Sequence, residues 1–178
     1  MPAPTATTPI SIRPSEPRDR EPLTDLVSSV GVFSPEDTSC ALELVDSALK
    51  DEARSGDYRI LIAECAGECA GECAGECAGE LAGYICYGPT PMTQGTWDLY
   101  WLATHPRWQR RGVAAALCQA MEDELRRAGG CLVRVETSST EGYGAAQRFY
   151  ESHGYPQACR IPGFYKPGDD LIIMFKRL

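Results

Sequence analysis

Short apolar runs predict strands along this chain, and longer stretches with apolar residues every three to four positions predict helices. Strands are expected at residues 10–14, 58–63, 81–87, 97–104, 131–136, 156–160 and 171–176. Helices are expected at residues 19–29, 35–54, 113–128 and 143–153. Prolines and glycines interrupt residues 161–170, which predicts a loop before the last strand. The chain is therefore expected to mix strands with helices.

The segment from Gln109 to Ala114 lies between a predicted strand and the helix predicted over residues 113–128. A helix N-terminus presents unpaired N–H groups and a partial positive charge, so it can bind an anion. Gly112 would let the backbone approach that anion without a side chain in the way. Arg110 and Arg111 add positive charge, although arginines before a helix are more often only solvated. The segment predicts a phosphate site.

A second segment, from Tyr143 to Tyr155, predicts a short helix that ends at Gly154 and has Ala146 and Phe149 on one face. It follows the strand predicted over residues 131–136. The two segments, in this order and about thirty residues apart, resemble the acyl-CoA-binding core of the GNAT superfamily of N-acetyltransferases.

The resemblance rests on two motifs of that superfamily. The first is the Gln/Arg-x-x-Gly-x-Gly/Ala pyrophosphate loop, which matches Gln109 to Ala114. The second is the Asn-x-x-Ala-x-x-Phe-Tyr-x-x-x-Gly-Phe/Tyr motif, which matches Ala146, Phe149, Tyr150, Gly154 and Tyr155. The chain departs from the second motif at Tyr143, where the family usually has asparagine.

The resemblance implies a mixed α+β (α/β) fold, with a centrally splayed, twisted sheet of about six to seven strands flanked by about four helices. It also implies acetyl-CoA as the cosubstrate, with its pantetheine arm between the splayed strands and no metal. The implied cofactor-binding residues are Leu102, Ala103, Thr104, Gln109, Arg110, Arg111, Gly112, Val113 and Ala114.

Acetyl transfer to an amine needs a neutral nucleophile, stabilisation of the oxyanion and a proton for the departing thiolate. Tyr150 stands where the family places its tyrosine general acid, although it could instead pack beside Phe149 in the core. By the same resemblance, the N–H of Leu102 is the expected oxyanion donor. Asp98 and Glu136 are the candidate bases, and either could instead contact a substrate ammonium or simply be solvated.

The acceptor amine is not specified by any single residue. The expected substrate-binding residues are Phe33, Tyr165, Asp169 and Asp170. The acidic pair suits a cationic amine, or it caps a turn before the last strand. The implied function is transfer of an acetyl group to a small-molecule or amino-acid-like amine by direct attack in a ternary complex. Alternatives are a protein N-terminal or lysine acetyltransferase, a noncatalytic acyl-CoA sensor, and a thiolate metal-binding protein.

The last alternative comes from Glu64 to Glu80, where Glu-Cys-Ala-Gly occurs four times in succession. Because a hairpin turn usually takes two to about five residues, this segment predicts an insertion between two paired strands. Four thiols at this spacing could bind a soft metal, or the repeat is a tolerated surface expansion. These cysteines are Cys65, Cys69, Cys73 and Cys77.

Length and composition narrow the remaining choices. The 178 residues suit one domain, expected over residues 10–178 after a flexible tail at residues 1–9. A formal net charge of −8 disfavours nucleic acid as a partner, and no stretch has the ~18 apolar residues of a membrane span. Nine cysteines without an export signal indicate reduced thiols in the cytoplasm. The oligomeric state is left open, a homodimer included.

Overall fold

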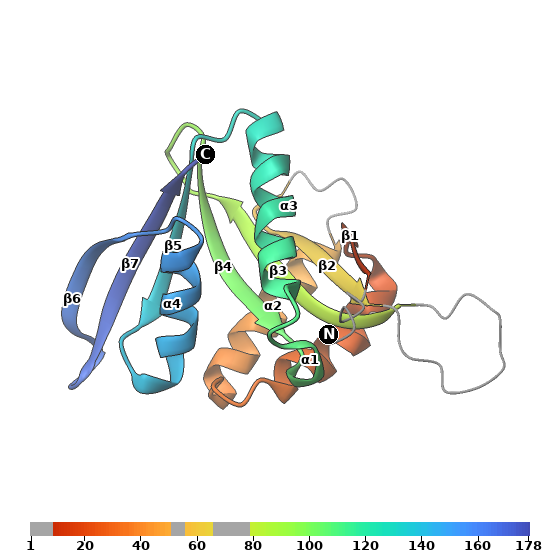
Figure 1. Cartoon of the computed structure of the whole chain (residues 1–178), viewed down its shortest axis with the longest axis horizontal. Coiled ribbons are helices and arrows are strands. Elements are labelled where there is room, and N and C mark those ends of the chain that lie inside the picture. The colour runs from red at the N-terminus through yellow and green to blue at the C-terminus, as the bar shows by residue number, and fades with distance from the viewer. Residues whose placement is uncertain (1–8, 51–55, 66–78) are drawn as a thin grey trace, which may run out of the picture.

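A sheet of seven strands, in the order β1-β2-β3-β4-β5-β7-β6, organises the molecule (Figure 1). The computed structural model describes residues 9–50, 56–65 and 79–178. The strands are β1 (Ile10–Pro14), β2 (Arg59–Cys65), β3 (Glu80–Pro89), β4 (Thr96–Thr104), β5 (Leu132–Ser138), β6 (Gln157–Lys166) and β7 (Asp169–Arg177). The predicted α+β fold with a mixed sheet is confirmed.

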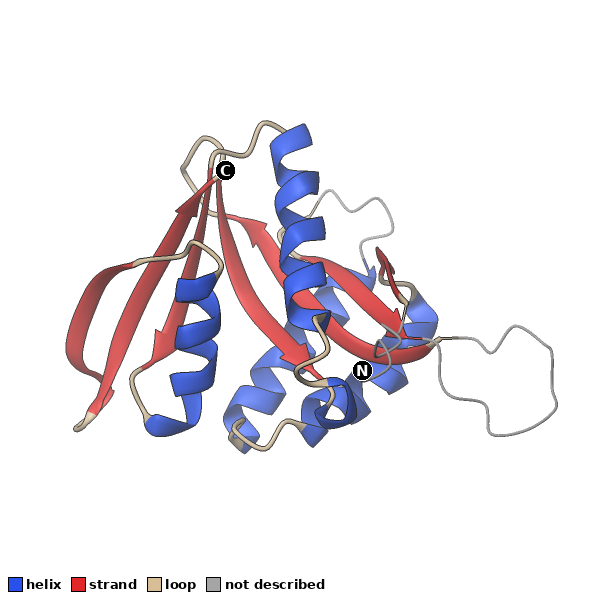
Figure 2. Cartoon of the chain, viewed as in Figure 1, coloured by secondary structure: helices blue, strands red, loops and turns tan. Residues whose placement is uncertain are grey.

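Helices cover both faces of the sheet, with α3 and α4 on one face and α1 and α2 on the other (Figure 2). They are α1 (Arg20–Ser29), α2 (Pro35–Lys50), α3 (Val113–Arg127) and α4 (Gly144–Ser152). Successive side chains of a strand point to opposite faces of the sheet. Because helices cover both faces, the inner strands are apolar on both sides. In β2, Leu61 and Ala63 join the core beneath α3, whereas Ile60 and Ile62 join the core beneath α1 and α2.

The start of α2 follows from local sequence. The N–H of Asp37 donates to the Ser34 hydroxyl at 3.0 Å, and the N–H of Ser34 donates to the Asp37 carboxylate at 2.9 Å. This reciprocal capping box, with Pro35 as the first helical residue, satisfies two N–H groups that a helix start leaves unpaired. The described helix ends at Lys50, and the rest of the segment predicted to be helical falls in residues 51–55, which are not described.

The sheet opens between β4 and β5, as Figure 1 shows. The two strands pair in parallel only from Thr96 opposite Leu132 to Leu99 opposite Val135. Farther along, β4 pairs with β3 alone as far as Thr104, while β5 pairs with β7 alone. One edge of each strand therefore lacks a β-ladder partner beyond this point, which gives the splayed centre that the resemblance implied.

A bulge in β4 lies at the point of divergence. Cys86 of β3 pairs with Trp101, but the next residue, Tyr87, pairs with Leu99, so Tyr100 is the extra residue. Because of this extra residue, Tyr100 and Trp101 both pack on the side of α1 and α2. The bulge thus changes which β4 side chains face each layer of helices.

The prediction of a loop over residues 161–170 is wrong. Most of this segment belongs to β6 and to the beginning of β7, although it contains Pro162 and Gly163. β6 is the edge of the sheet and all of its residues are exposed, so a proline there removes no N–H that an inner ladder would need. Its pairing with β7 is irregular between Ile161 and Lys166, which is where the proline lies.

Two predicted segments lie mainly outside the described residues. Of the N-terminal tail only residue 9 is described, and of the cysteine repeat from Glu64 to Glu80 residues 66–78 are not described. The ends of the repeat are described, and there Cys65 pairs with Glu80 as the last position of the β2–β3 ladder. Among the described helices, none is long and apolar enough to cross a membrane.

Candidate active site

The loop between β4 and α3 has the form of an anion site. Gly112 precedes the helix with a φ of 87°, in the left-handed region that favours glycine. A Cβ at this position would meet no described atom within 4 Å, so it is the backbone conformation that requires glycine there. The carbonyl of Gly112 accepts the first helical bond, from the N–H of Ala116 at 2.9 Å. The N–H groups before Ala116 in the first turn of α3 are thus left without intrahelical acceptors.

The charge at this helix end is positive and exposed. Arg110 and Arg111 are exposed, and Arg110 makes no ion pair with a described carboxylate. The guanidinium of Arg111 lies over the ring of Trp108, 5.0 Å from its centroid, which holds it beside the loop. Unpaired amides, a helix dipole and unneutralised cations together fit a pyrophosphate group.

The end of β4 leads directly into this loop. Leu102, Ala103 and Thr104 pair with β3 on one side and have no ladder partner on the side of β5. Extended backbone with an open edge can bind another extended chain such as a pantetheine arm. The structure therefore brings the predicted cofactor-binding residues together, from the open edge of β4 through the loop to the start of α3 (Figure 1).

Tyr150 of α4 lies in the core on the same face of the sheet as α3. Its side chain is 6% exposed and packs edge to face against Phe149 and Tyr155, with ring centroids 5.5 Å and 5.8 Å away. Burial, followed by the neighbouring thiol of Cys118, raises its pKa above the ordinary value. None of the hydrogen bonds among the described residues involves its hydroxyl. The phenol is thus protonated and free to donate.

The two predicted bases lie on the opposite face, joined by Arg134. Asp98 is 6% exposed and accepts from Arg134 Nε at 2.6 Å. Glu136 is more exposed, and its carboxylate lies 3.4 Å from the Arg134 guanidinium. Glu136 is the first residue of β5 after its pairing with β4 ends at Val135. The hydrogen bond that Arg134 donates to Asp98 is the main reason that the pKa of Arg134 is raised.

Aromatic rings and carboxylates gather on that same face. Phe33, which precedes α2, packs edge to face on Trp101 of β4 at 5.1 Å. Tyr165 of β6 is 48% exposed, and its pKa is raised by partial burial and then by the charges of Glu136, Asp169 and Asp37. Two of the four predicted acceptor residues, Phe33 and Tyr165, thus belong to this aromatic and acidic surface.

The other two, Asp169 and Asp170, have contacts within the fold. Asp169 is buried and accepts from the Ser138 hydroxyl at 2.6 Å. Asp170 accepts from the N–H of Gly163 at 2.7 Å and from Arg160 Nε at 2.6 Å, and these two interactions lower its pKa. Its contacts fit the alternative in which the acidic pair holds the turn between β6 and β7.

Two polar residues of this region, Arg134 and Asp37, were missed by sequence reasoning, and Tyr143 was noted only as a departure from the family motif. The Tyr143 hydroxyl donates to the Asp37 carboxylate at 3.3 Å. Partial burial and this carboxylate raise the pKa of Tyr143 to about 12. The only sequence signal was Tyr143 itself, at the position where the family motif carries asparagine.

The described part of the chain holds no metal-binding cluster beside the site. Within residues 9–50, 56–65 and 79–178, no three His, Cys, Asp or Glu side chains are grouped so as to hold a metal ion. The described cysteines are free thiols, and Cys65, at the edge of the repeat, is buried.

Comparison with known proteins agrees with this geometry. The model of the acetyltransferase (GNAT) family matches residues 36–155. A structure described as an acetyltransferase of the GNAT family from Desulfovibrio desulfuricans is 36% identical, with a TM-score of 0.80 over 95% of this chain and 99% of that one. No match was found among curated protein sequences.

Two more distant structures share the fold. One is yncA from Salmonella typhimurium with its cofactor acetyl-CoA, at 20% identity and a TM-score of 0.68 over 96% of this chain and 95% of that one. The other is the ribosomal-protein-S18-alanine N-acetyltransferase from Escherichia coli, at 19% identity and a TM-score of 0.68 over 95% and 94%. From the family match and the 36% identical structure, this chain belongs to the GNAT family of acetyltransferases and is an acyltransferase that uses acetyl-CoA as its cosubstrate.

Proposed function

We propose that this protein transfers the acetyl group of acetyl-CoA to a primary amine of a small-molecule or amino-acid-like acceptor, in one ternary complex. One observation carries the donor half: the open edge of β4 runs into a helix start whose amides are unpaired and whose glycine has a φ of 87°. We assign the activity to a single domain over residues 10–178. The free thiols of the described cysteines support a place in the cytoplasm.

The reaction joins the amine nitrogen to the acetyl carbon and breaks the carbon–sulfur bond, so the sulfur leaves as a thiolate that needs a proton. We assign that proton to the buried, unbonded phenol of Tyr150. The N–H of Leu102 is our candidate for the oxyanion donor. For the proton that the amine loses, we favour Glu136, because it is exposed beside the open edge, whereas Asp98 is held by Arg134.

The surface around these carboxylates supports a cationic acceptor with an apolar part. Phe33, Trp101 and Tyr165 offer rings, and Glu136 and Asp37 offer negative charge for an ammonium group. An α-amine at a protein N-terminus meets the same description, so such a peptide is our second candidate. The Escherichia coli enzyme of the same fold is named for an alanine acceptor.

Calorimetric titration with acetyl-CoA tests the donor half. We expect saturable binding that Gly112→Asp weakens by at least about tenfold, because a carboxylate would repel the pyrophosphate. Gly129→Asp is the matched control, since Gly129 also has a positive φ, also has open space for a Cβ, and lies at the other end of α3. Equal loss in both variants, or in neither, would contradict the assignment.

An acceptor panel tests the second half. Small primary amines, free amino acids and peptides with an N-terminal alanine are incubated with acetyl-CoA, and the acetylated products are measured by mass spectrometry. We expect turnover with at least one cationic amine. Tight acetyl-CoA binding without any product would support the acyl-CoA sensor instead. Metal in protein purified without chelators would support the thiolate alternative.

A further inference from the structure

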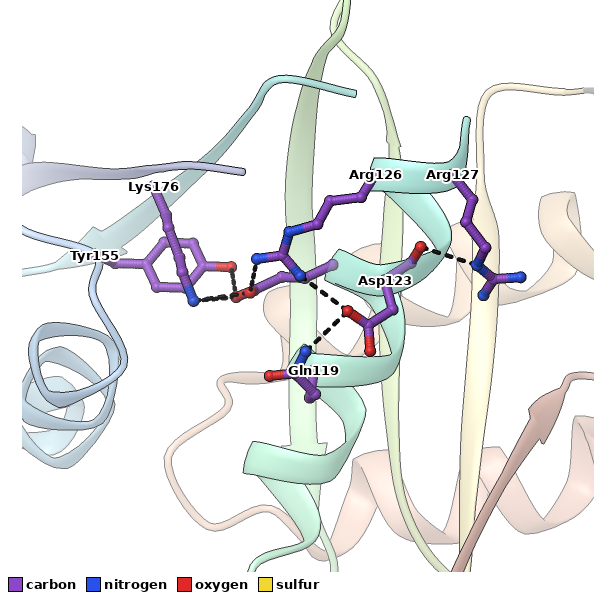
Figure 3. Close-up of polar contacts among 7 residues, drawn as sticks. Gln119, Asp123, Arg126, Arg127, Tyr155 and Lys176 are labelled. Atoms are coloured by element: carbon purple, nitrogen blue, oxygen red, sulfur yellow. Dashed lines mark hydrogen bonds and ion pairs between the residues drawn. The ribbon is translucent and has the colours of Figure 1, made fainter. Parts of the chain in front are cut away.

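A buried carboxylate in α3 lies outside the site described above. Glu122 is 2% exposed and accepts from Lys176 Nζ at 2.7 Å on both of its oxygens. It also accepts from the Tyr155 hydroxyl at 2.8 Å and from Arg126 at 3.1 Å. Figure 3 shows Lys176, Tyr155 and Arg126 converging on one carboxylate from different elements. A buried charge is tolerated only with such partners, so this carboxylate fixes their positions.

Tyr155 connects this carboxylate to the proposed acid. It follows the end of α4, where Gly154 has a φ of 85° and the N–H of Tyr155 donates to the carbonyl of Tyr150 at 3.0 Å. The two rings also pack together, with centroids 5.8 Å apart. Such a backbone bond and apolar contact are the two parts of a Schellman helix end. Any shift of Tyr155 is therefore transmitted to Tyr150 through both.

The same helix carries the cofactor loop at its other end. α3 begins next to Gly112 and continues to Arg127, and Glu122 lies in its last turns. A helix of this length is a rigid rod of about 22 Å, which fixes the distance between its two ends. The pyrophosphate site and the support of Tyr155 are thus parts of one rigid element.

We propose that Glu122 is a positioning residue for acetyl transfer: through the Tyr155 hydroxyl it fixes the Tyr150 phenol relative to the cofactor loop at the start of α3. The inference rests on the proposed role of Tyr150 as the acid. Small misplacement of a reacting group is costly in catalysis, and an error of about 1 Å can lower the rate about 100-fold.

Tyr155→Phe is the sharpest test, because it removes only the hydroxyl and keeps the ring contact and the backbone bond. Using the fastest amine of the panel, we expect kcat to fall about tenfold while the KM for acetyl-CoA changes less than about twofold. Glu122→Gln keeps an oxygen that can accept from Tyr155 but loses the charge that pairs with Lys176. It should unfold at a lower temperature than Tyr155→Phe and yet have the higher kcat.

A double-mutant cycle separates positioning from general stability. In the Tyr150→Phe background, Tyr155→Phe should cause no further loss of kcat, since no phenol remains to be positioned. Asp123→Asn is the control: it changes an exposed neighbour on the same helix that contacts the same Arg126 at 2.9 Å (Figure 3). Its kcat should equal that of the wild type.

The outcomes distinguish this inference from the function on which it rests. An unchanged kcat in Tyr150→Phe would contradict the acid role of Tyr150, and the positioning role with it. A lower kcat in Tyr150→Phe, combined with an unchanged kcat in Tyr155→Phe or with additive losses in the double variant, would contradict the positioning role of Glu122 alone.

Discussion

At the scale of single residues, Tyr150 decides the chemistry that we propose. Burial raises its pKa above the ordinary value of about 10, so the phenol keeps its proton at higher pH than a free tyrosine does. We expect Tyr150→Phe to lower kcat about 100-fold with little change in acetyl-CoA affinity. In the wild type, the decline of kcat that reports loss of this proton should lie above about pH 10.

Tyr84 provides the matched control for that substitution. Tyr84 is fully buried, and its hydroxyl lacks a partner among the described residues, but it lies on the face of α1 and α2. Tyr84→Phe should leave kcat unchanged, because its phenol packs on the opposite face of the sheet from Tyr150. If both variants lost activity equally, the effect would belong to the core and the acid role would be wrong.

Substitutions of the two carboxylates beside Arg134 should differ in their effects on stability and on turnover. Asp98 is buried in an ion pair, so Asp98→Asn should lower the free energy of unfolding by about 1–2 kcal/mol. Glu136 is more exposed, so Glu136→Gln should leave the free energy of unfolding nearly unchanged and reduce kcat at neutral pH. Urea unfolding and steady-state rates measure the two quantities. The reverse pattern would indicate that Asp98, and not Glu136, is the general base.

At the scale of elements, a half-buried arginine connects β1 to β2 and to the start of α1. Arg13 donates to Asp19, which precedes α1, and to Glu64 of β2, with contacts at 2.7 Å. Burial raises the pKa of Asp19, but the hydrogen bonds from Arg13 and from the N–H of Glu16 outweigh it, and the net shift is downward.

The lowered pKa of Asp19 predicts a pH dependence. The interaction stabilises the fold fully above the pKa of the unfolded state, about 3.9, and is lost as pH falls through the lower folded-state value. Arg13→Met should therefore cost about 1–3 kcal/mol at pH 7 and less at pH 2. Urea unfolding at both pH values measures the difference. An equal cost at the two pH values would indicate that lost packing dominates.

Local signals explain which elements could be predicted from the sequence. The helices, the cofactor loop and the acid candidate depend on residues within a few positions of each other, such as Ser34 with Asp37 or Gly112 at the start of α3. The start of β6 was predicted as a strand at residues 156–160, but its continuation to Lys166 could not be predicted, because only its place at the sheet edge makes Pro162 compatible with a strand.

The acceptor side of the site could not be predicted either, because it depends on strand register. The ion pair of Asp98 with Arg134 joins residues 36 positions apart, and it exists because β4 and β5 pair in parallel there. The contact of Tyr143 with Asp37 spans 106 positions. One sequence without its sheet order cannot specify such neighbours, so Asp37 and Arg134 emerge only from the fold.

At the scale of the whole molecule, the described flanks of the cysteine repeat lie beside the start of the cofactor loop, where Gly83 of β3 pairs with Thr104 of β4. The repeat joins β2 to β3, whereas the open edge lies on the far side of β4, between it and β5. Its two flanks are fixed by the fold: Glu64 pairs with Arg13, and Glu80 pairs with Arg107. The hairpin is therefore anchored by residues that a deletion of the repeat would retain.

Replacing residues 66–79 by Asn-Gly should close this hairpin directly, because Cys65 and Glu80 are already opposite each other. Shortening the connection about sevenfold should raise the free energy of unfolding by about 1–2 kcal/mol, since less loop entropy is lost on folding. Acetyl-CoA affinity and turnover should match the full chain, while any zinc bound by the repeat should disappear from elemental analysis. A variant that folds equally well but no longer binds acetyl-CoA would show that the repeat itself takes part in donor binding, beyond the contact of Glu80 with Arg107 that the variant keeps.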